Sequence, residues 1–180
     1  TGATGATGAA GSTLTGLSDA LVEDSSIYIG HDPSNTTDSA QNNIAIGVTA
    51  LDAITSGDDN IAIGANALTS ITTASKNVGI GYGVLRLNQT GSNNTAVGYH
   101  AMSTPATTSS NNSAFGYFAL ENVAANANSA FGMQALRANT TGDSNSAFGT
   151  GALSSNITGD YNTAVGYNAL QQSKVSRNTA

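Results

Sequence analysis

The chain has 180 residues, of which 9% are charged, and its eleven acidic and five basic side chains give a net charge of −6. So few Lys and Arg residues leave no basic patch for nucleic-acid binding. The chain contains no cysteine, which excludes disulfides, thiolate catalysis and thiolate metal sites. No stretch has the apolar run of a membrane span or a signal peptide, so we expect no membrane insertion.

Residues 1–13 differ from the rest of the chain, because Gly2, Gly5, Gly8 and Gly11 place a glycine at every third position. Only glycine fits at the axis of a collagen triple helix, so this spacing predicts the end of a collagen-like stalk. A flexible linker of Gly, Ala and Thr is an equally good interpretation, because the segment has no proline. Residues 14–25 then predict a short adaptor.

Residues 26–180 predict one repeat domain. The motif Asn-x-Ala-Φ-Gly-x-x-Ala-Leu, in which Φ is a large apolar residue, recurs about every 17 residues, with one interval of 18 followed by one of 16. Such self-similarity predicts an all-β fold, a parallel β-roll or β-solenoid of about nine coils, with an atypical first coil and a last copy that is cut off. The glycines of the motif are Gly30, Gly47, Gly64, Gly81, Gly98, Gly116, Gly132, Gly149 and Gly166.

Two apolar columns in each period predict the core, and they indicate two short strands per coil. The first column precedes each glycine: Ile29, Ile46, Ile63, Ile80, Val97, Phe115, Phe131, Phe148 and Val165. The second column lies four residues after the glycines: Leu51, Leu68, Leu85, Met102, Leu120, Leu136, Leu153 and Leu170.

A column of small residues predicts a subunit interface. Side chains alternate along a strand, so if the branched residues face the interior, the small ones face outward. A stripe with almost no side chains allows another backbone to approach closely, and closure by rotational symmetry is the simplest outcome. We therefore expect an oligomer, a homotrimer, joined through this stripe: Ala45, Ala62, Gly79, Ala96, Ala114, Ala130, Ala147 and Ala164.

A column of asparagines predicts hydrogen-bonded corners, because identical Asn side chains stacked at the coil spacing can bond to one another and to turn backbone. We expect the glycines that precede four of these asparagines, at Gly57, Gly91, Gly142 and Gly159, to permit positive φ. The predicted turn residues are Asn43, Asn60, Asn77, Asn94, Asn112, Asn128, Asn145 and Asn162.

Little in the chain indicates chemistry, and we expect neither an enzyme nor a cofactor. Asp143 and Asp160, one period apart, could form a pair of carboxylates as in glycosidases, but Asp is common at turns. Asp58, Asp143 and Asp160 are weak calcium candidates beside glycine turns, and solvated turn acids are favoured. His31 and His100 fall at different repeat positions, which does not favour a metal site.

Three tyrosines, Tyr82, Tyr99 and Tyr117, occupy the same position in consecutive coils. A stacked aromatic ladder inside or along the solenoid is the favoured interpretation. An exposed ridge that contacts receptor glycans is the sharper hypothesis.

Repeats such as residues 162–170 and 145–149 resemble those of phage tail-fibre proteins, particularly of cyanophages. They are also similar to the head repeats of trimeric autotransporter adhesins. The resemblance covers residues 26–180 and implies a left-handed β-roll, a homotrimer and a virion or cell-surface location. The period of 17 is longer than in the adhesin heads.

We therefore predict a non-catalytic structural module of a viral tail fibre, a rigid shaft or head for host attachment. Its partners would be further copies of itself, other fibre or tail proteins, and a host surface glycan or protein contacted through residues 32–41 and 103–110. The alternatives are a bacterial surface adhesin and a polysaccharide-degrading tailspike section. Ice binding is a poor further alternative, because the residues after the asparagines, Ile44 to Thr163, do not keep threonine in register.

Overall fold

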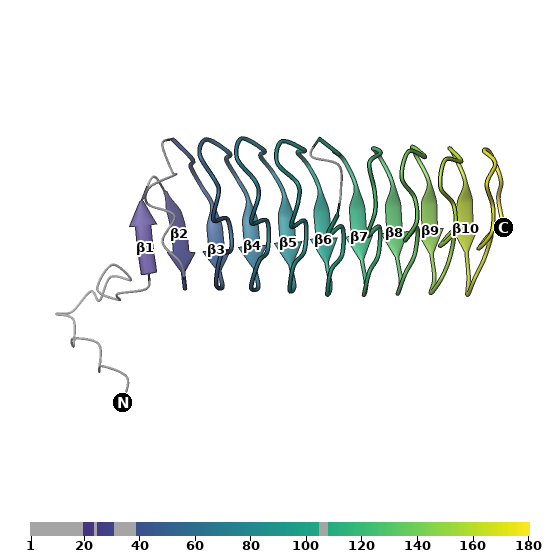
Figure 1. The fold of residues 1–180 in the computed structure, drawn as a ribbon, viewed down its shortest axis with the longest axis horizontal. Helices are drawn as coiled ribbons and strands as arrows, with labels where there is room; N and C mark the ends of the chain where they lie inside the picture. Colours follow the sequence, from purple (N-terminus) through teal and green to yellow (C-terminus); the bar gives the residue numbers. More distant parts are fainter. Residues whose placement is uncertain (1–19, 24, 31–38, 105–107) are drawn as a thin grey trace, which may run out of the picture.

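The computed structural model describes residues 20–23, 25–30, 39–104 and 108–180, which form an elongated rod of stacked coils (Figure 1). The described part of the chain has strands and turns and no helix. The collagen-like segment 1–13 and most of the adaptor lie outside the described residues. The strands are β1 (Ala20–Glu23), β2 (Ser26–Ile29), β3 (Ile44–Ile46), β4 (Ile61–Ile63), β5 (Val78–Ile80), β6 (Thr95–Val97), β7 (Ser113–Phe115), β8 (Ser129–Phe131), β9 (Ser146–Phe148) and β10 (Thr163–Val165).

The predicted β-solenoid is confirmed, with a simpler coil than expected. Strands β2 to β10 form nine parallel strands in chain order, about eight turns of a solenoid, and β1 pairs antiparallel with β2. Each regular coil contributes one strand, so the prediction of two strands per coil was wrong. The antiparallel β1 covers the edge of the sheet that β2 would otherwise expose, and a covered edge resists unwanted strand pairing.

Each three-residue strand supplies one residue to each of three columns, which we name the entry, alanine and exit columns. In β4 these residues are Ile61, Ala62 and Ile63, which pair with Val78, Gly79 and Ile80 of β5. The columns stay aligned through the irregular periods, because Thr95 of β6 pairs with Ser113 and Ser113 pairs with Ser129. The extra residue of the 18-residue interval and the missing residue of the 16-residue interval therefore lie in the turns, outside the sheet.

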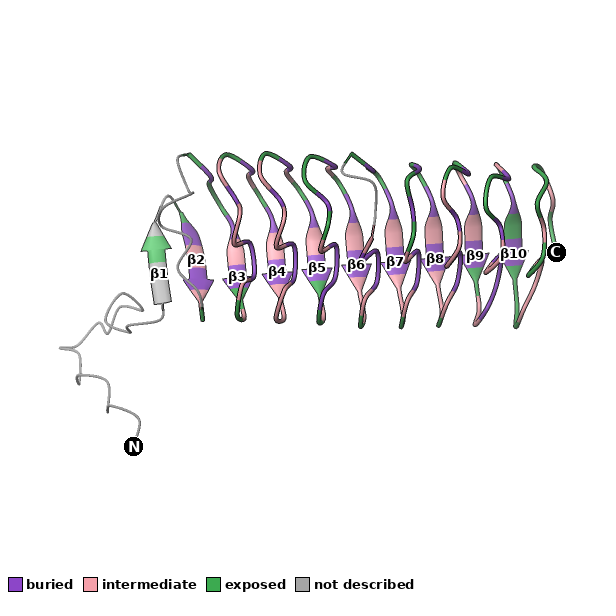
Figure 2. Cartoon of the chain, in the orientation of Figure 1, coloured by how far each residue is buried: buried purple, intermediate pink, exposed green. Residues whose placement is uncertain are grey.

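The alanine column lies inside the coil, so the predicted faces of the strands were the wrong way round. Its alanines are 0 to 2% exposed within a single chain, whereas Ile46 and Ile80 of the exit column are 39% and 38% exposed. Figure 2 shows the result as a buried band across the middle of the strands. The alanine stripe therefore cannot be the subunit interface, and the exit column is not the core. The corrected interior residues are Ala45, Ala62, Gly79, Ala96, Ala114, Ala130, Ala147 and Ala164.

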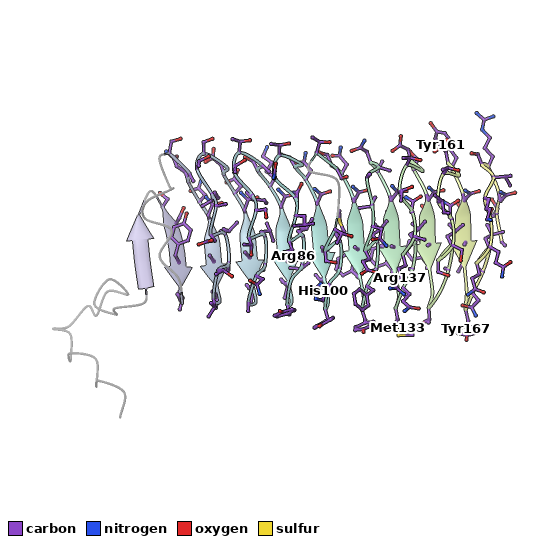
Figure 3. The ribbon with its side chains drawn as sticks, in the orientation of Figure 1. Arg86, His100, Met133, Arg137, Tyr161 and Tyr167 are labelled. Carbon is purple, nitrogen blue, oxygen red and sulfur yellow. The ribbon has the colours of Figure 1, made fainter. Side chains whose placement is uncertain are left out.

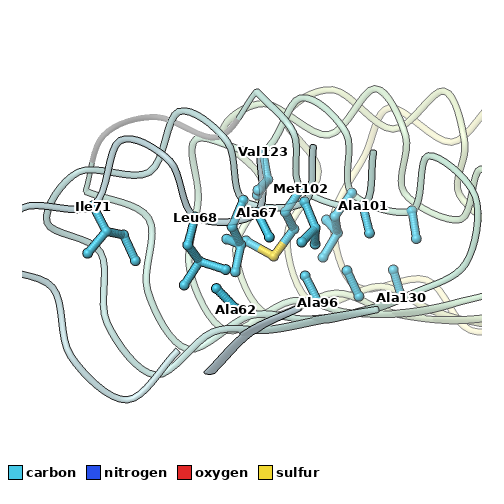
Figure 4. Close-up of a cluster of buried hydrophobic side chains, with 14 of the residues drawn as sticks. Ala62, Ala67, Leu68, Ile71, Ala96, Ala101, Met102, Val123 and Ala130 are labelled. Atoms are coloured by element: carbon cyan, nitrogen blue, oxygen red, sulfur yellow. The ribbon is translucent and has the colours of Figure 1, made fainter. Parts of the chain in front are cut away.

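The coil is thin, which explains why small residues face inward. The opposite wall fills the interior with the leucine column, and Figure 4 shows Ala62, Ala96 and Ala130 facing Leu68 and Met102 across this narrow core. From Leu51 to Leu153 the leucine column is fully buried, which confirms it as core. Its last member, Leu170, is partly buried and packs against the same cluster.

One coil displays the tightness of this packing. Gly79 replaces alanine in the strand, and a Cβ atom there would overlap Leu68 and lie 3.0 Å from Val84 Cγ1. In the same coil, Val84 stands where seven other coils have alanine three residues after the motif glycine. The lost methyl group and the added methyl groups therefore compensate, as expected in an interior packed at crystal-like density.

The leucine column adopts an unusual backbone conformation. All eight members have positive φ, between 48° for Met102 and 54° for Leu51. This region is unfavourable for a bulky residue, but here it turns the side chain into the core and the N–H toward the next coil. Leu68 N, for example, donates to Val84 O at 2.9 Å. Complete burial and the hydrogen bond offset the strained conformation.

The motif glycines allow adjacent coils to approach closely. From Gly47 to Gly166 their φ values lie between 129° and 140°, and a Cβ atom at Gly98 would lie 2.6 Å from Gly116 O in the next coil. The corner glycines have a different role from the predicted one. Gly57 and Gly91 are absent from the residues with positive φ, and they are required because a Cβ atom would overlap the carbonyl of the next coil.

The predicted asparagine column forms a buried ladder along the rod. Each Asn Oδ1 accepts the backbone N–H of the next asparagine, as in Asn77 N to Asn60 Oδ1 at 3.0 Å, and Ser26 begins the series by accepting Asn43 N at 2.9 Å. The side-chain amides donate to the preceding asparagine and to corner carbonyls, as Asn94 Nδ2 does to Asn77 Oδ1 at 3.1 Å and to Ser109 O at 2.8 Å. All eight predicted asparagines are 0% exposed, so the ladder satisfies polar groups that would otherwise be buried without partners.

The first coil ends the core with a larger side chain. Tyr28 occupies the alanine column, pairs with Ala45 and is fully buried. The sequence has Ser34 where later coils have leucine. The large Tyr28 side chain therefore fills interior space in the coil whose sequence has no leucine in the leucine column.

Candidate functional surface

The outer face of the sheet is a partly apolar surface of the described rod. The entry and exit columns point to this face, because they flank the buried alanine column in every strand. Exposure in the exit column is 39% for Ile46, 43% for Phe148 and 63% for Val165. Neither column contains a charged residue from β3 to β10, so an uncharged strip extends over most of the rod.

Aromatic side chains continue the exit column in the second half of the rod. Phe115 and Phe131 stack with ring centroids 4.7 Å apart, and Phe131 and Phe148 stack at 4.9 Å. The ring planes differ by 8° and 6°. This regular stacking follows from parallel strands that place identical residues at the same level.

The predicted tyrosine ladder is present at the turn that follows each strand. Tyr82 and Tyr99 stack at 5.5 Å, as do Tyr99 and Tyr117, and all three are 47 to 48% exposed. Stacking covers both ring faces of Tyr99, between Tyr82 and Tyr117. Figure 3 shows Met133 and Tyr167, from the equivalent position of later coils, along this same edge of the rod.

A second row of side chains packs beside the tyrosines. His100 stacks on Phe118 at 5.5 Å and meets Tyr99 edge-on at 4.5 Å. Arg137 lies over the Phe118 ring at 5.2 Å, and its Nε is 2.7 Å from Glu121 Oε2. His100 is therefore a member of an aromatic cluster, and His31 lies outside the described residues.

The candidate acids belong to a structural row that we name the outer ladder. Each of its side chains accepts the backbone N–H of the equivalent residue one coil earlier. Asp58 Oδ1 accepts Gln41 N at 2.8 Å, and Asp160 Oδ1 accepts Asp143 N at 2.9 Å. The members are Asp58, Ser75, Ser92, Ser110, Asn126, Asp143, Asp160 and Ser176.

This ladder explains the spacing of Asp143 and Asp160 without catalysis. Asp143 Oδ1 is itself occupied by Asn126 N at 2.7 Å, so each carboxylate has a backbone partner. Ser and Asn fill the same position in other coils, which indicates that any short acceptor suffices there. Within the described residues, no group of three or more His, Asp or Glu side chains is arranged to hold a metal ion.

A second set of asparagines, which was not predicted from the sequence, is also buried. Asn88, Asn139 and Asn156 are 0% exposed at the position where Ile54, Ile71 and Val123 stand in other coils. Asn88 binds Gly91 twice, through Gly91 N to Oδ1 at 3.0 Å and Nδ2 to Gly91 O at 2.7 Å. The signal was available, because an asparagine three residues before a corner glycine recurs in all three of these coils.

The fold and this surface define the class of protein as a parallel β-solenoid with an uncharged, partly apolar sheet face. In comparisons with known proteins, no family model, curated protein or solved structure matches the chain. No helix in the described part of the chain could span a membrane. Of the segments predicted to contact a receptor, residues 32–38 and 105–107 lie outside the described residues.

Proposed function

We propose that this chain is a non-catalytic structural module of a viral tail fibre, a rigid homotrimeric rod that serves host attachment. The observation that carries the proposal is the uninterrupted stack from β2 to β10, in which every coil is joined to the next by parallel strand pairing. A rod in which each coil contacts only its neighbours extends in one direction and can hold its two ends apart, which is the function of a spacer.

The side-chain ladders support a mechanical role. The asparagine ladder and the outer ladder join successive coils at two positions of the same corner, two residues apart, for example through Asn60 and Asp58. Backbone bonds such as Gly64 N to Ile46 O, at 2.8 Å, add to them along the sheet. Relative motion of two coils would break all of these bonds together, so the rod resists bending.

The surface chemistry supports an external, multivalent role. With 9% charged residues the exterior consists largely of Thr, Ser, Asn and apolar side chains, and repeated weak contacts along a rod can add up to strong attachment. The resemblance of the repeats to phage fibres favours the virion over the bacterial cell surface as the location. A bacterial trimeric adhesin is the alternative, with the same rod and the same assembly.

The solution mass and shape of the 180-residue chain test the proposal. Light scattering should give the mass of three chains, and small-angle X-ray scattering should give an elongated particle. A folded monomer would contradict the trimeric rod. Loss of size of host envelope polysaccharide on incubation with the protein would contradict the non-catalytic role and favour a tailspike section.

The tyrosine ladder favours a second role, contact with host glycans. Its rings are half exposed and regularly spaced at 5.5 Å, and aromatic rings bind the apolar faces of sugars. The triple variant Y82A/Y99A/Y117A should reduce binding to host envelope glycan at least tenfold while keeping the fold. The variant Val48→Ala, at the same turn position of another coil, is the control. Unchanged glycan binding by the folded triple variant would exclude the ridge as the contact.

A further inference from the structure

The outer sheet face changes composition along the rod in a correlated way. In β3 and β4 the entry and exit residues are both isoleucine, as in Ile61 and Ile63. In β7, β8 and β9 the entry residue is serine and the exit residue is phenylalanine, as in Ser129 and Phe131. In β7, β8 and β9, therefore, a small entry residue accompanies a large exit residue, whereas β6 and β10 carry threonine and valine.

Such compensation is expected where side chains are packed. On a surface exposed to water, the sizes of two neighbouring side chains are independent of each other. In a closely packed contact, a larger residue requires a smaller one beside it. The interior of this same rod gives an example, because Gly79 and Val84 change together. The paired change from isoleucine and isoleucine to serine and phenylalanine thus indicates that the outer face is covered by a partner.

The geometry points to further copies of this chain as that partner, parallel and in register, and we propose that the entry column of one copy packs against the exit column of the next. When a rotation axis runs parallel to the rod, equal levels meet and the entry column faces a neighbour's exit column. Ser129 of one copy then opposes Phe131 of another, and isoleucine opposes isoleucine in the first coils. The inference rests on the proposed homotrimeric rod and names the face that joins it.

An antiparallel arrangement does not preserve this match. Reversing one rod brings entry columns against each other and reverses the levels, so that β9 would face β4. Ser146 would then meet Ile61, while Phe148 would meet Ile63. One column would be underfilled and the other overfilled, and both defects destabilise packed interfaces.

Charge and area agree with self-association. The chain carries a net charge of −6, so acidic side chains buried between copies would repel one another, and the entry and exit columns from β3 to β10 contain none. Nine strands about 4.8 Å apart give a length of roughly 38 Å, and five residues across the strand and its turn give roughly 16 Å. Two such faces would bury about 1,200 Å², the lower end of the range for specific interfaces.

Charged substitutions test the face itself. Ser129→Arg and Phe131→Arg should convert the oligomer to monomers with unchanged circular dichroism, because each places a charge in the contact. Thr158→Arg, on an exposed turn away from the sheet, is the matched control and should leave the mass unchanged. If the unmodified chain is a monomer, the proposed function fails. If it is an oligomer that both sheet variants preserve, this inference alone fails.

Cross-linking tests the direction, since the chain has no native cysteine. Ile46→Cys and Val165→Cys label the exit column at β3 and β10, roughly 34 Å apart along the rod by strand spacing. With a bis-maleimide shorter than half the rod, each variant alone should form covalent dimers. In an oligomer refolded from both variants, mass spectrometry should find only links between identical positions. Dimers that form only between position 46 of one copy and position 165 of another would overturn the parallel arrangement.

Discussion

At the scale of single residues, asparagine does most to make this fold specific. In one position it satisfies two backbone groups of the next coil at once, as Asn94 does by accepting from Asn112 N at 3.0 Å and donating to Ser109 O at 2.8 Å. A buried amide without partners costs about 1–3 kcal/mol for each group, so a complete ladder is stabilising while a broken one is costly. The repeated asparagine is therefore required at every level.

We predict that Asn94→Ala lowers the free energy of unfolding by about 2–4 kcal/mol, because Asn112 N–H and Ser109 C=O lose their partner inside the rod. Chemical denaturation followed by circular dichroism measures the change. Gln89→Ala, on an exposed turn, is the control and should change stability by less than about 0.5 kcal/mol. Equal stability of the two variants would mean that water replaces the buried amide.

This part of the structure was accessible from the sequence, because the same residue type recurs at each level and can bond only along the stack. The second set of asparagines was harder to recognise, since Asn88, Asn139 and Asn156 share their column with isoleucine and valine. A column that accepts both apolar and polar residues has no single chemical signature. Its polar members are recognised only through the corner glycine that each one binds.

At the scale of the strand, three residues are enough to form a stable strand because the adjacent coils supply its hydrogen-bond partners. A strand such as β5 has a buried middle residue and two outer ones, and a parallel strand pairs with it on each side. The narrow interior limits that middle residue to alanine or glycine in the regular coils. Here the coil tolerates volume changes only when they are compensated.

We predict that Gly79→Ala destabilises the rod by about 1–3 kcal/mol through overpacking against Leu68 and Val84. Val84→Ala alone should cost about 2 kcal/mol through the cavity that it leaves. The double variant has the same residue pair as the neighbouring coils. Its loss in free energy of unfolding should therefore be smaller than the sum of the two single losses. Additive effects in thermal unfolding would show that the two side chains do not share a space.

Strand alternation predicted two faces correctly and assigned them wrongly, for a physical reason. Alternation separates Ile61 and Ile63 from Ala62, but it does not say which set faces the interior. That choice depends on what the opposite wall supplies, and here the wall supplies leucines whose positive φ directs them inward. The correlated change at Gly79 and Val84 was the local signal that small residues face a limited space.

At the scale of the whole molecule, the rod behaves as a one-dimensional stack whose stability is the sum of coil and interface contributions. No coil is central, since β3 to β9 each have one neighbouring strand on either side. The irregular periods around Gly116 leave the sheet register intact. The rod can therefore gain or lose whole coils without a change in its cross-section.

We predict that deleting residues 48–64, one full period, yields a folded rod shorter by about 4.8 Å, because Gly47 then continues into the equivalent turn at Ala65. Deleting residues 48–56, about half a period, should prevent folding of the coils that it joins, because the columns no longer align. Circular dichroism and small-angle scattering distinguish the two results. A misfolded full-period variant would mean that coils are not interchangeable.

The two ladders described above run in opposite directions, and this gives the rod a chemical polarity. Asn60 offers its side-chain oxygen to the following coil, whereas the N–H of Asp58 donates to a side chain of that coil. Each finished coil thus presents an acceptor and a donor side by side at one corner, a pattern that only the next coil in the same orientation completes. During synthesis, a completed coil can serve as the template on which the nascent chain lays down its successor.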